Sequence, residues 1–207
     1  MNMTKMGMVI KLNRCVGCHT CSIGCKMSNN VPQGMLWNRV LSEGAEVVDG
    51  SVGEFPALVK TFLPVACQHC ENPACMRVCP TGATYKDADG RVEIDYDKCI
   101  GCRMCMAACP YNARTFNWND PVRDPDFNYG DARVPVRQRG VMEKCTMCKE
   151  RTDAGEKPMC VAQCPTHARV FGDLDDPTSE VAQLVRSGKV ERLLESKGTA
   201  PQIYYIR

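Results

Sequence analysis

Apolar and polar residues alternate in two short segments that each lead into a cysteine. The segments are MVIKLNRC (residues 8–15) and VEIDYDKC (residues 92–99), where Ile10 and Leu12, or Ile94 and Tyr96, take alternate positions. Such alternation predicts a short β-strand with a buried face. Both segments also place a basic residue directly before the cysteine. We therefore interpret them as two copies of one strand-to-loop unit.

A second phrase recurs after three later cysteines. It is CPTGATY from Cys79, CPYNARTF from Cys109 and CPTHARVF from Cys164, with proline next, alanine four residues after the cysteine and an aromatic residue shortly afterwards. The proline suits a tight turn or the first turn of a helix, and the aromatic residue suits the start of a strand. The sequence thus predicts a repeated unit of strand, cysteine loop, short helix and strand.

The segments outside these repeats predict fewer helices and strands than the repeats do. Residues 31–60 indicate turns and short strands, and the Asp-, Pro-, Asn- and Arg-rich residues 117–139 indicate an ordered surface loop. Thr178 or Ser179 is placed to cap a helix, and a second short helix is predicted at 190–194. The apolar positions of the first helix are Val181, Leu184 and Val185. The closing PQIYYIR predicts a strand or an extended arm, and no apolar run approaches the roughly 18 residues of a membrane span.

Cysteine dominates the candidate chemistry, with 16 of 207 residues. The third of four cysteine groups has the spacing C-x2-C-x2-C-x3-C followed by Pro110, as in bacterial ferredoxins, where three thiolates reach one cubane and the fourth reaches a second cluster. The first group lacks the proline, and the second and fourth widen one gap to four and eleven residues. The four quartets are Cys15, Cys18, Cys21 and Cys25; Cys67, Cys70, Cys75 and Cys79; Cys99, Cys102, Cys105 and Cys109; and Cys145, Cys148, Cys160 and Cys164.

Disulfides, structural zinc and iron–sulfur clusters compete as uses for these cysteines. Disulfides need an oxidising compartment, and the N-terminal MNMTKMGMVIKLNRC has no apolar core region or twin-arginine pair, so we expect no export signal of its own. Zinc sites use two CxxC pairs with a longer spacer rather than four cysteines within eleven residues. The spacing favours iron–sulfur clusters over the other two uses.

The rest of the composition excludes some functions. Lys and Arg total 26 against 24 Asp and Glu, and this formal charge of +2 does not indicate a nucleic-acid partner. We find no phosphate-binding glycine loop and no nucleophile–base pair, so no catalytic residue is predicted. His19, His69 and His167 lie in or just after the cysteine loops, where hydrogen bonding is favoured over ligation because each quartet is complete.

Other residues near the cysteines or in the loops have more than one interpretation. Gly17 and Gly101 lie between the first two cysteines of their quartets, where we expect the backbone to pass close to sulfide. The loop arginines form either a docking patch or a solvated surface, and two aromatic residues and one apolar residue near the end of the chain are predicted to anchor the tail on a partner. The methionines near the cysteines are predicted to pack around the clusters. These sets are Arg133, Arg137 and Arg139; Tyr204, Tyr205 and Ile206; and Met76, Met104, Met106, Met147 and Met159.

The chain resembles the four-cluster iron–sulfur subunits of the dimethyl sulfoxide reductase superfamily, including those of polysulfide, tetrathionate and arsenate reductases. The resemblance covers nearly the whole length. The phrase NN-x-P-x-G-x-x-W favours the polysulfide, tetrathionate and arsenate branch. The stretches that carry the resemblance are CSIGCKMSNNVPQGMLWNRV at 21–40, QHCENPACMRVCPTGA at 68–83, KCIGCRMCMAACPYNAR at 98–114, KCTMCKERTDAGEKPMCVAQCPTHA at 144–168 and GTAPQIYYI at 198–206.

The resemblance implies an α+β fold of two bacterial-ferredoxin-like modules, built from βαβ repeats and related by a pseudo-twofold axis. The outer module comprises 1–30 and 140–174, and the inner module comprises 61–116. An insertion at 31–60, a surface loop at 117–139 and C-terminal helices with a docking arm at 175–207 complete the chain. The ligation implied is crossed between quartets: Cys15, Cys18, Cys21 and Cys164; Cys25, Cys145, Cys148 and Cys160; Cys67, Cys70, Cys75 and Cys109; and Cys79, Cys99, Cys102 and Cys105.

The function implied is single-electron transfer through four [4Fe-4S] clusters, without catalysis by this chain. Its partners would be a molybdenum or tungsten bis-pterin catalytic subunit and a membrane anchor or another redox partner. The complex would be membrane-associated through those partners and co-exported with the catalytic subunit, with a cytoplasmic complex as the alternative. The alternative functions are a polyferredoxin of a formate dehydrogenase, hydrogenase or hydrogenlyase complex, and a zinc-stabilised interaction protein.

Overall fold

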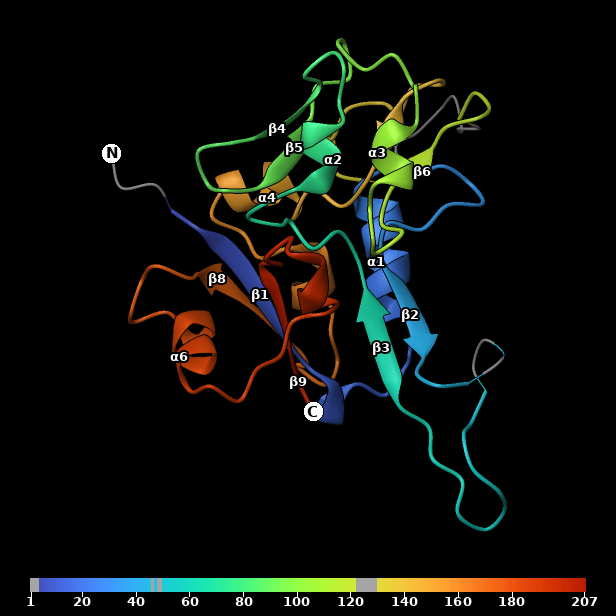
Figure 1. Cartoon of the computed structure of the whole chain (residues 1–207), viewed down its shortest axis with the longest axis vertical. Helices are drawn as coiled ribbons and strands as arrows, with labels where there is room; N and C mark the ends of the chain where they lie inside the picture. The colour runs from blue at the N-terminus through green and yellow to red at the C-terminus, as the bar shows by residue number, and fades with distance from the viewer. Residues whose placement is uncertain (1–3, 46, 48–49, 122–129) are drawn as a thin grey trace.

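The computed structural model describes residues 4–45, 47, 50–121 and 130–207. Short strands, often two in succession, are interspersed with short helices along the chain (Figure 1). The strands are β1 (Met6–Lys11), β2 (Arg39–Ser42), β3 (Phe62–Val65), β4 (Thr84–Lys86), β5 (Val92–Ile94), β6 (Thr115–Phe116), β7 (Met142–Glu143), β8 (Arg169–Asp173) and β9 (Ile203–Ile206). The α-helices are α1 (Thr20–Ser28), α2 (Ala74–Arg77), α3 (Met104–Ala107), α4 (Lys149–Asp153), α5 (Met159–Ala162) and α6 (Glu180–Arg186). Leu12–Arg14 and Glu195–Lys197 form 3-10 turns.

The largest sheet joins the two ends of the chain. Strand β1 pairs antiparallel with β8 and parallel with β9, in the order β8-β1-β9. On one face, Val9 and Tyr204 pack with Val181 of helix α6. On the other face, Met8 and other apolar residues of β1 and β9 pack among the cysteine loops. The predicted alternation at β1 is confirmed, but α6 covers the second face, so both faces of this strand are buried.

The remaining sheets are two-stranded, and two of them join successive repeat units. Strand β4, after the second quartet, pairs antiparallel with β5, before the third. Strand β6, after the third quartet, pairs antiparallel with β7, before the fourth. The aromatic residue of each recurring phrase lies in the strand that follows it: Tyr85 in β4, Phe116 in β6 and Phe171 in β8. The predicted unit of strand, cysteine loop, short helix and strand is therefore confirmed for the third quartet.

The helices that carry cysteines pack in pairs. Helix α1 packs against α5, and α2 packs against α3. Three of these four helices have only four residues, and α1 has nine. Isolated helices of this length are unstable in water, so tertiary packing must hold them. Helix α4 lies in the long gap of the fourth quartet, where the sequence predicted only a loop.

The C-terminal region agrees only in part with the sequence prediction. Helix α6 begins directly after Ser179, although the Ser179 side chain makes no capping hydrogen bond. The prediction of a helix at 190–194 is wrong, because Glu191 instead pairs with Tyr205 through a β-bridge. Within the part of the chain that the structure describes, no helix combines the length and apolar character needed to cross a membrane.

The tail is a strand, as predicted, but its aromatic residues do not project toward a partner. Tyr204 and Tyr205 are 6% and 0% exposed, because β9 adds to the sheet edge beside β1. The prediction that these tyrosines anchor the tail on a partner is therefore wrong. Part of the surface loop predicted at 117–139, residues 122–129, lies outside the described residues.

The buried hydroxyl of Tyr205 ties the tail to the segment before the second quartet. It donates to the carbonyl oxygen of Pro64 (3.0 Å) and accepts from Nε2 of Gln68 (3.3 Å). We predict that Tyr205→Phe lowers the free energy of unfolding by about 1–3 kcal/mol, because it removes buried hydrogen bonds. Thermal unfolding followed by circular dichroism should show a midpoint lower by about 2–12 °C.

The matched control is Tyr85→Phe, since Tyr85 lies at a solvent-exposed position of β4. This change should alter the midpoint by about 1 °C or less, as for most exposed positions. Equal midpoints for the Tyr205 and Tyr85 variants would contradict a stabilising role for the buried hydroxyl.

Candidate iron–sulfur sites

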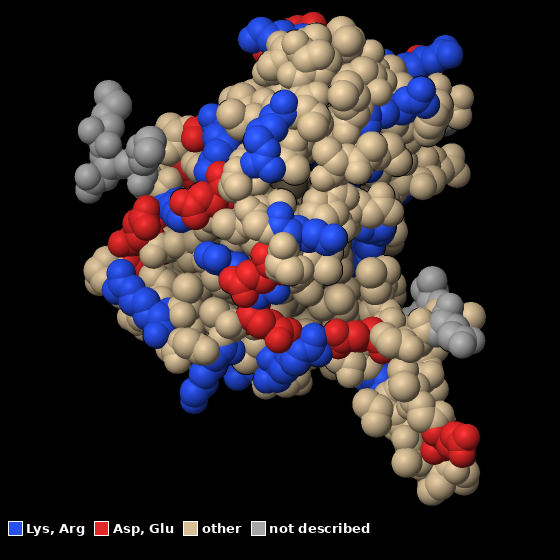
Figure 2. Space-filling model, viewed as in Figure 1, with Lys and Arg blue, Asp and Glu red and all other residues tan. Residues whose placement is uncertain are grey.

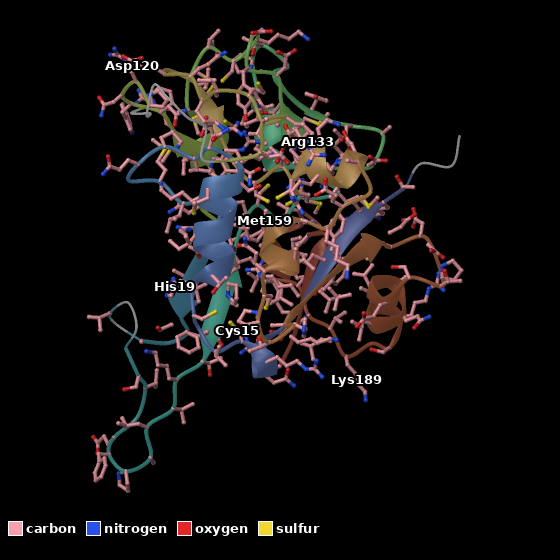
Figure 3. The ribbon with its side chains drawn as sticks, turned by 180° about the vertical axis from the view of Figure 1, so that it is seen from behind. Cys15, His19, Asp120, Arg133, Met159 and Lys189 are labelled. Atoms are coloured by element: carbon pink, nitrogen blue, oxygen red, sulfur yellow. The ribbon has the colours of Figure 1, made fainter. Side chains whose placement is uncertain are left out.

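All sixteen cysteines lie among the described residues, and none is in a disulfide. Two of them, Cys18 and Cys102, are exposed at the surface. The buried ones are Cys21, Cys25, Cys70, Cys105, Cys148 and Cys160, and the other eight are partly buried. Figure 3 shows Cys15 and His19 near the same end of α1, with Met159 on the neighbouring helix α5.

The same backbone turn recurs in every cysteine loop. The residue before the second cysteine of each quartet has a positive φ angle: Gly17 (69°), His69 (41°), Gly101 (66°) and Met147 (53°). Left-handed backbone reverses the chain locally, which lets two thiols with two residues between them face the same point. The four loops therefore share one local conformation, although only two of them have glycine there.

At Gly17 and Gly101 the glycine is also required by packing. A Cβ at Gly17 would lie 2.3 Å from the Phe62 ring, and one at Gly101 would lie 2.2 Å from the carbonyl oxygen of Gly140. The sequence predicted a close approach to sulfide at these positions. The structure shows a close approach of other chain segments as well.

The histidines have backbone roles that the sequence did not indicate. His19 (φ 57°), His69 and His167 (φ 50°) all have left-handed backbone, which histidine adopts more readily than most residues. His69 is fully buried, and its Nδ1 accepts a hydrogen bond from the Val92 N–H (3.1 Å). Burial, followed by the charge of Lys144, lowers the pKa of His69 well below its usual value.

One cavity brings together cysteines from opposite ends of the sequence. Its lining includes Cys25 of the first quartet and Cys145, Cys148 and Cys160 of the fourth. Cys67 also lines this cavity. Burial raises the pKa of the Cys25 thiol well above its usual value, and the neighbouring Cys145, Cys148 and Cys160 raise it further. Four thiols that disfavour one another's ionisation need a compensating positive charge, which an iron–sulfur core supplies.

The wall of this cavity also has polar groups without partners. Nε1 of Trp37, Nδ2 of Asn38 and Oγ1 of Thr146 are buried there and make no hydrogen bond in the structure. Buried polar groups of this kind are rarely left unpaired in proteins. An iron–sulfur cluster offers sulfur acceptors, so the donor set and the thiol set fit the same group. Among the described residues, no three Cys, His, Asp or Glu side chains come close enough to hold a single metal ion.

A second cavity has the corresponding arrangement around the third quartet. Its lining includes Cys79 of the second quartet and Cys99, Cys102 and Cys105 of the third. Ile94 and Met142 supply apolar walls. Because Cys102 is exposed, this cavity lies near the surface of the molecule.

The other cysteines also have neighbours outside their own quartet. Cys15 lies near Cys21 and near Cys164 of the fourth quartet; burial first, then these thiols, raises its pKa. Cys70 lies near Cys75 and near Cys109 of the third quartet; burial first, then these thiols, raises its pKa.

Backbone N–H groups point at several thiol sulfurs. Met147 donates to Cys145 (3.4 Å), Met159 to Cys148 (3.5 Å) and Ala168 to Cys164 (3.3 Å). Such bonds favour the ionised form of a thiol and help to set the potential of a bound cluster. Met147 itself has left-handed backbone and Ala168 directly follows such a residue, so these turns position both donors.

The sequence analysis did not identify Trp37 as a site residue, and it placed Arg137 in the surface loop and not at a cysteine site. Arg137 stacks over the Trp37 ring (4.5 Å) and donates to the carbonyl oxygen of Asn29 (2.9 Å). Nδ2 of Asn29 in turn lies 3.7 Å from the sulfurs of both Cys25 and Cys148. The phrase NN-x-P-x-G-x-x-W contains Asn29 and Trp37, and it was the one sequence signal that pointed to them.

The structure also separates the three loop arginines. Arg137 is 4% exposed, so both interpretations of it, as a docking residue and as a solvated one, are wrong. Arg133 is exposed and pairs with Asp131 and Glu156. Arg139 is exposed and lies 3.7 Å from Asp120.

The methionines divide in a similar way. Met147 is 2% exposed and packs in the core, as predicted. The prediction that all five methionines pack around the clusters is wrong, because three of the five are solvent-exposed. These are Met76 (42%), Met104 (51%) and Met106 (36%).

The comparisons with known proteins agree with this donor set. The family described as 4Fe-4S dicluster domain matches residues 58–124 and 131–174, and a 4Fe-4S binding domain matches residues 12–28. A candidate iron–sulfur subunit of a dimethyl sulfoxide reductase, from Halobacterium salinarum, is 52% identical, over 99% of this chain and 79% of the relative.

Two further relatives belong to other reductases. A subunit of the selenate reductase of Mesobacillus selenatarsenatis is 44% identical, over 96% of this chain and 70% of the relative. The arsenate respiratory reductase iron–sulfur subunit of a Shewanella species is 38% identical, over 98% of this chain and 96% of the relative.

The thiols should differ in reactivity when no cluster is bound. The side chain of Thr20 lowers the pKa of the exposed Cys18 thiol, whereas burial raises the pKa of Cys25. A lowered pKa means a larger thiolate fraction at a given pH, and the thiolate is the reactive form. We predict that iodoacetamide at pH 7 modifies Cys18 of the apoprotein at least tenfold faster than Cys25, as measured by peptide mass spectrometry.

Raising the pH to 9 should accelerate modification of Cys18 less than that of a thiol with an unshifted pKa, because more of it is ionised at pH 7. The control is the same reaction in concentrated urea, where the difference between Cys18 and Cys25 should disappear. Equal rates without urea would contradict the buried position of Cys25.

Proposed function

This chain belongs to the 4Fe-4S dicluster family of reductase iron–sulfur subunits, and we propose that its sixteen cysteines hold four clusters in series. Its cofactors are [4Fe-4S] clusters, and it is an electron-transfer subunit. When bound, each cluster supplies a one-electron centre. The chain itself supplies the thiol ligands, the hydrogen bonds to sulfur and the separation from water, which together set the potentials.

The ligands of each cluster come from two quartets. The observation that carries this proposal is the buried cavity where Cys25 meets Cys145, Cys148 and Cys160 beside unpaired donors. The cavity with Cys79, and the neighbours of Cys15 and Cys70, support the other three sets. The sets are Cys15, Cys18, Cys21 and Cys164; Cys25, Cys145, Cys148 and Cys160; Cys67, Cys70, Cys75 and Cys109; and Cys79, Cys99, Cys102 and Cys105. We number the clusters 1 to 4 in this order.

The cluster pairs define two modules related by a pseudo-twofold axis. The outer module comprises 1–30 and 140–174 and holds clusters 1 and 2. The inner module comprises 61–116 and holds clusters 3 and 4. Pairing of β1 with β8 and packing of α1 on α5 support the outer module. Pairing of β4 with β5 and packing of α2 on α3 support the inner one in the equivalent positions.

The partner is a catalytic subunit that carries a molybdenum or tungsten bis-pterin cofactor. The names of the relatives, each a single subunit of a reductase, support a separate catalytic chain. A membrane anchor or another redox protein exchanges electrons at the opposite end. The exposed cysteines Cys18 and Cys102, in clusters 1 and 4, support entry and exit at these two clusters. We also propose that these partners attach the chain to the outer face of the membrane.

Paired cysteine variants test the crossed ligation. We predict that Cys164→Ser and Cys18→Ser abolish the same electron paramagnetic resonance signal of the reduced protein, because both remove ligands of cluster 1. Cys25→Ser and Cys160→Ser should abolish a different one. The unaltered protein should contain about sixteen iron and sixteen acid-labile sulfide per chain.

The matched control lies within one quartet. Cys18→Ser and Cys25→Ser should abolish different signals, although both residues belong to the first quartet. Loss of the same signal in these two variants would show local ligation, and a protein with zinc in place of iron would overturn the whole proposal.

An exposed apolar arm adjoins cluster 1 and supports docking of the catalytic subunit at this end. Residues 51–60 are all exposed and form a hairpin with a bridge between Val52 and Val59. The arm projects from strands β2 and β3 in Figure 1, and its surface in Figure 2 is mostly uncharged, with an acidic residue near the tip. Phe55 at its tip is 87% exposed. Phe62, at the base of the arm, lies against Gly17 of the first quartet.

We predict that Phe55→Asp weakens binding of the co-expressed catalytic subunit about thirtyfold, which corresponds to about 2 kcal/mol for a buried aromatic anchor. Affinity should be measured by titration of purified subunits. The matched control is Val136→Asp, an exposed apolar residue in another loop (60% exposed), which should leave the affinity unchanged. Undiminished binding by Phe55→Asp would contradict docking through the arm.

A further inference from the structure

Two arginines at equivalent positions of the repeat are buried among cysteines. Arg114 ends the phrase CPYNAR and Arg169 ends the phrase CPTHAR, each five residues after the last cysteine of its quartet. They are 2% and 6% exposed, respectively. Arginine is rarely buried unless its charge is compensated, so the position of both side chains needs an explanation.

Arg169 contacts thiols of two different cluster sites. Its Nη2 donates to the sulfur of Cys21 (3.5 Å) and to Oδ1 of Asn38 (3.0 Å). Its side chain also lines the cavity of Cys25 and Cys160. Burial opposes its charge, but Cys160 and Cys21 raise the pKa of Arg169 above its usual value. No carboxylate among the described residues forms an ion pair with Arg169.

Arg114 has the corresponding position in the inner module. Its Nη1 donates to Oγ1 of Thr84 (3.3 Å), and its buried Nη2 makes no hydrogen bond in the structure. Burial opposes its charge, but Cys75, Cys105 and Cys67 raise the pKa of Arg114 above its usual value. Cys67 and Cys75 belong to cluster 3 in the proposed ligation, and Cys105 belongs to cluster 4.

We propose that Arg169 and Arg114 are potential-setting residues, each next to cysteines assigned to both clusters of one module. This inference rests on the proposed function and its crossed ligation. Each guanidinium lies next to thiol ligands of both clusters, where it stabilises the extra negative charge that one-electron reduction adds. A fixed positive charge in a buried environment acts more strongly than one in water. Each arginine therefore raises the potentials of its two clusters together and leaves those of the other module unchanged.

A third buried arginine, Arg91, has a different environment from that of Arg169 and Arg114. Arg91 is 2% exposed, but three carboxylates compensate its charge: Asp87 (2.7 Å), Asp89 (2.6 Å) and Asp153 (2.7 Å). Arg91 is thus an arginine of the ordinary buried, ion-paired kind. Arg169 and Arg114 have thiols where Arg91 has carboxylates.

The test is a redox titration of the cluster-loaded protein, monitored by electron paramagnetic resonance. Arg169→Gln should lower two of the four potentials by at least about 59 mV each. For a one-electron couple, this shift corresponds to a tenfold smaller equilibrium constant for reduction. Arg114→Gln should lower the other two by a similar amount. Arg169→Lys retains the charge and should restore both potentials to within about twofold, whereas Arg91→Gln should change none of the four.

A milder variant keeps the test valid if Arg169→Gln does not fold. Asn38→Asp leaves Arg169 in place but puts a carboxylate where the amide oxygen now accepts its hydrogen bond. This variant should lower both of the same potentials, because it compensates the positive charge, whereas loss of Nδ2 as a donor alone would affect only the cluster held by Cys25. Unchanged potentials in a fully loaded Asn38→Asp or Arg114→Gln protein, or a uniform shift of all four, would overturn the inference.

Iron and acid-labile sulfide analysis separates this failure from failure of the proposed function. An unaltered protein with fewer than four clusters refutes the proposed function. If the protein has all four clusters but the arginine substitutions leave the potentials unchanged, only the role given to Arg169 and Arg114 is refuted.

Discussion

Thiols from distant parts of the chain must meet at common points, and the rest of the structure depends on this constraint. Cys25 shares a cavity with Cys145, Cys148 and Cys160, and Cys79 shares another with Cys99, Cys102 and Cys105. The β1–β8 and β4–β5 pairings and the packing of α1 on α5 bring these segments together. The elements themselves are too short to be stable alone. The core around the cysteines therefore holds the helices in place, rather than the reverse.

A single backbone conformation makes this convergence possible at the local level. The residue before the second cysteine is left-handed in all four loops, whether it is glycine, histidine or methionine. The turn thus follows from the ligand geometry rather than from the residue type. Glycine is needed only where another segment leaves no room for a Cβ, as at Gly17 and Gly101. This explains why His69, which has that position in the second loop, adopts left-handed backbone.

The sequence predicted those features that depend on local patterns. The cysteine spacing, the alternation at β1 and the aromatic residues after each phrase identified the quartets and their flanking strands because each signal lies within a short stretch of chain. Features that depend on distant partners were missed. Tyr205 lies in a terminal segment that the sequence suggests is exposed, but its strand forms the sheet edge beside β1. Arg137 lies in a polar loop that suggests solvent exposure, but its side chain stacks on Trp37. Met104 resembles a core residue, but its short helix faces solvent.

Electrostatics links cluster loading to folding. The overall charge of +2 conceals an uneven distribution, since surface charges of both signs are interspersed (Figure 2) while Arg114, Arg169 and Lys144 are buried near cysteines. Each cluster with four thiolates adds about two negative charges at the point where these cations lie. Without that charge, Arg114 keeps an unpaired Nη2 in the interior, which is costly. The same residues that influence the potentials therefore also favour the loaded state, so that binding of the clusters contributes directly to the stability of the fold.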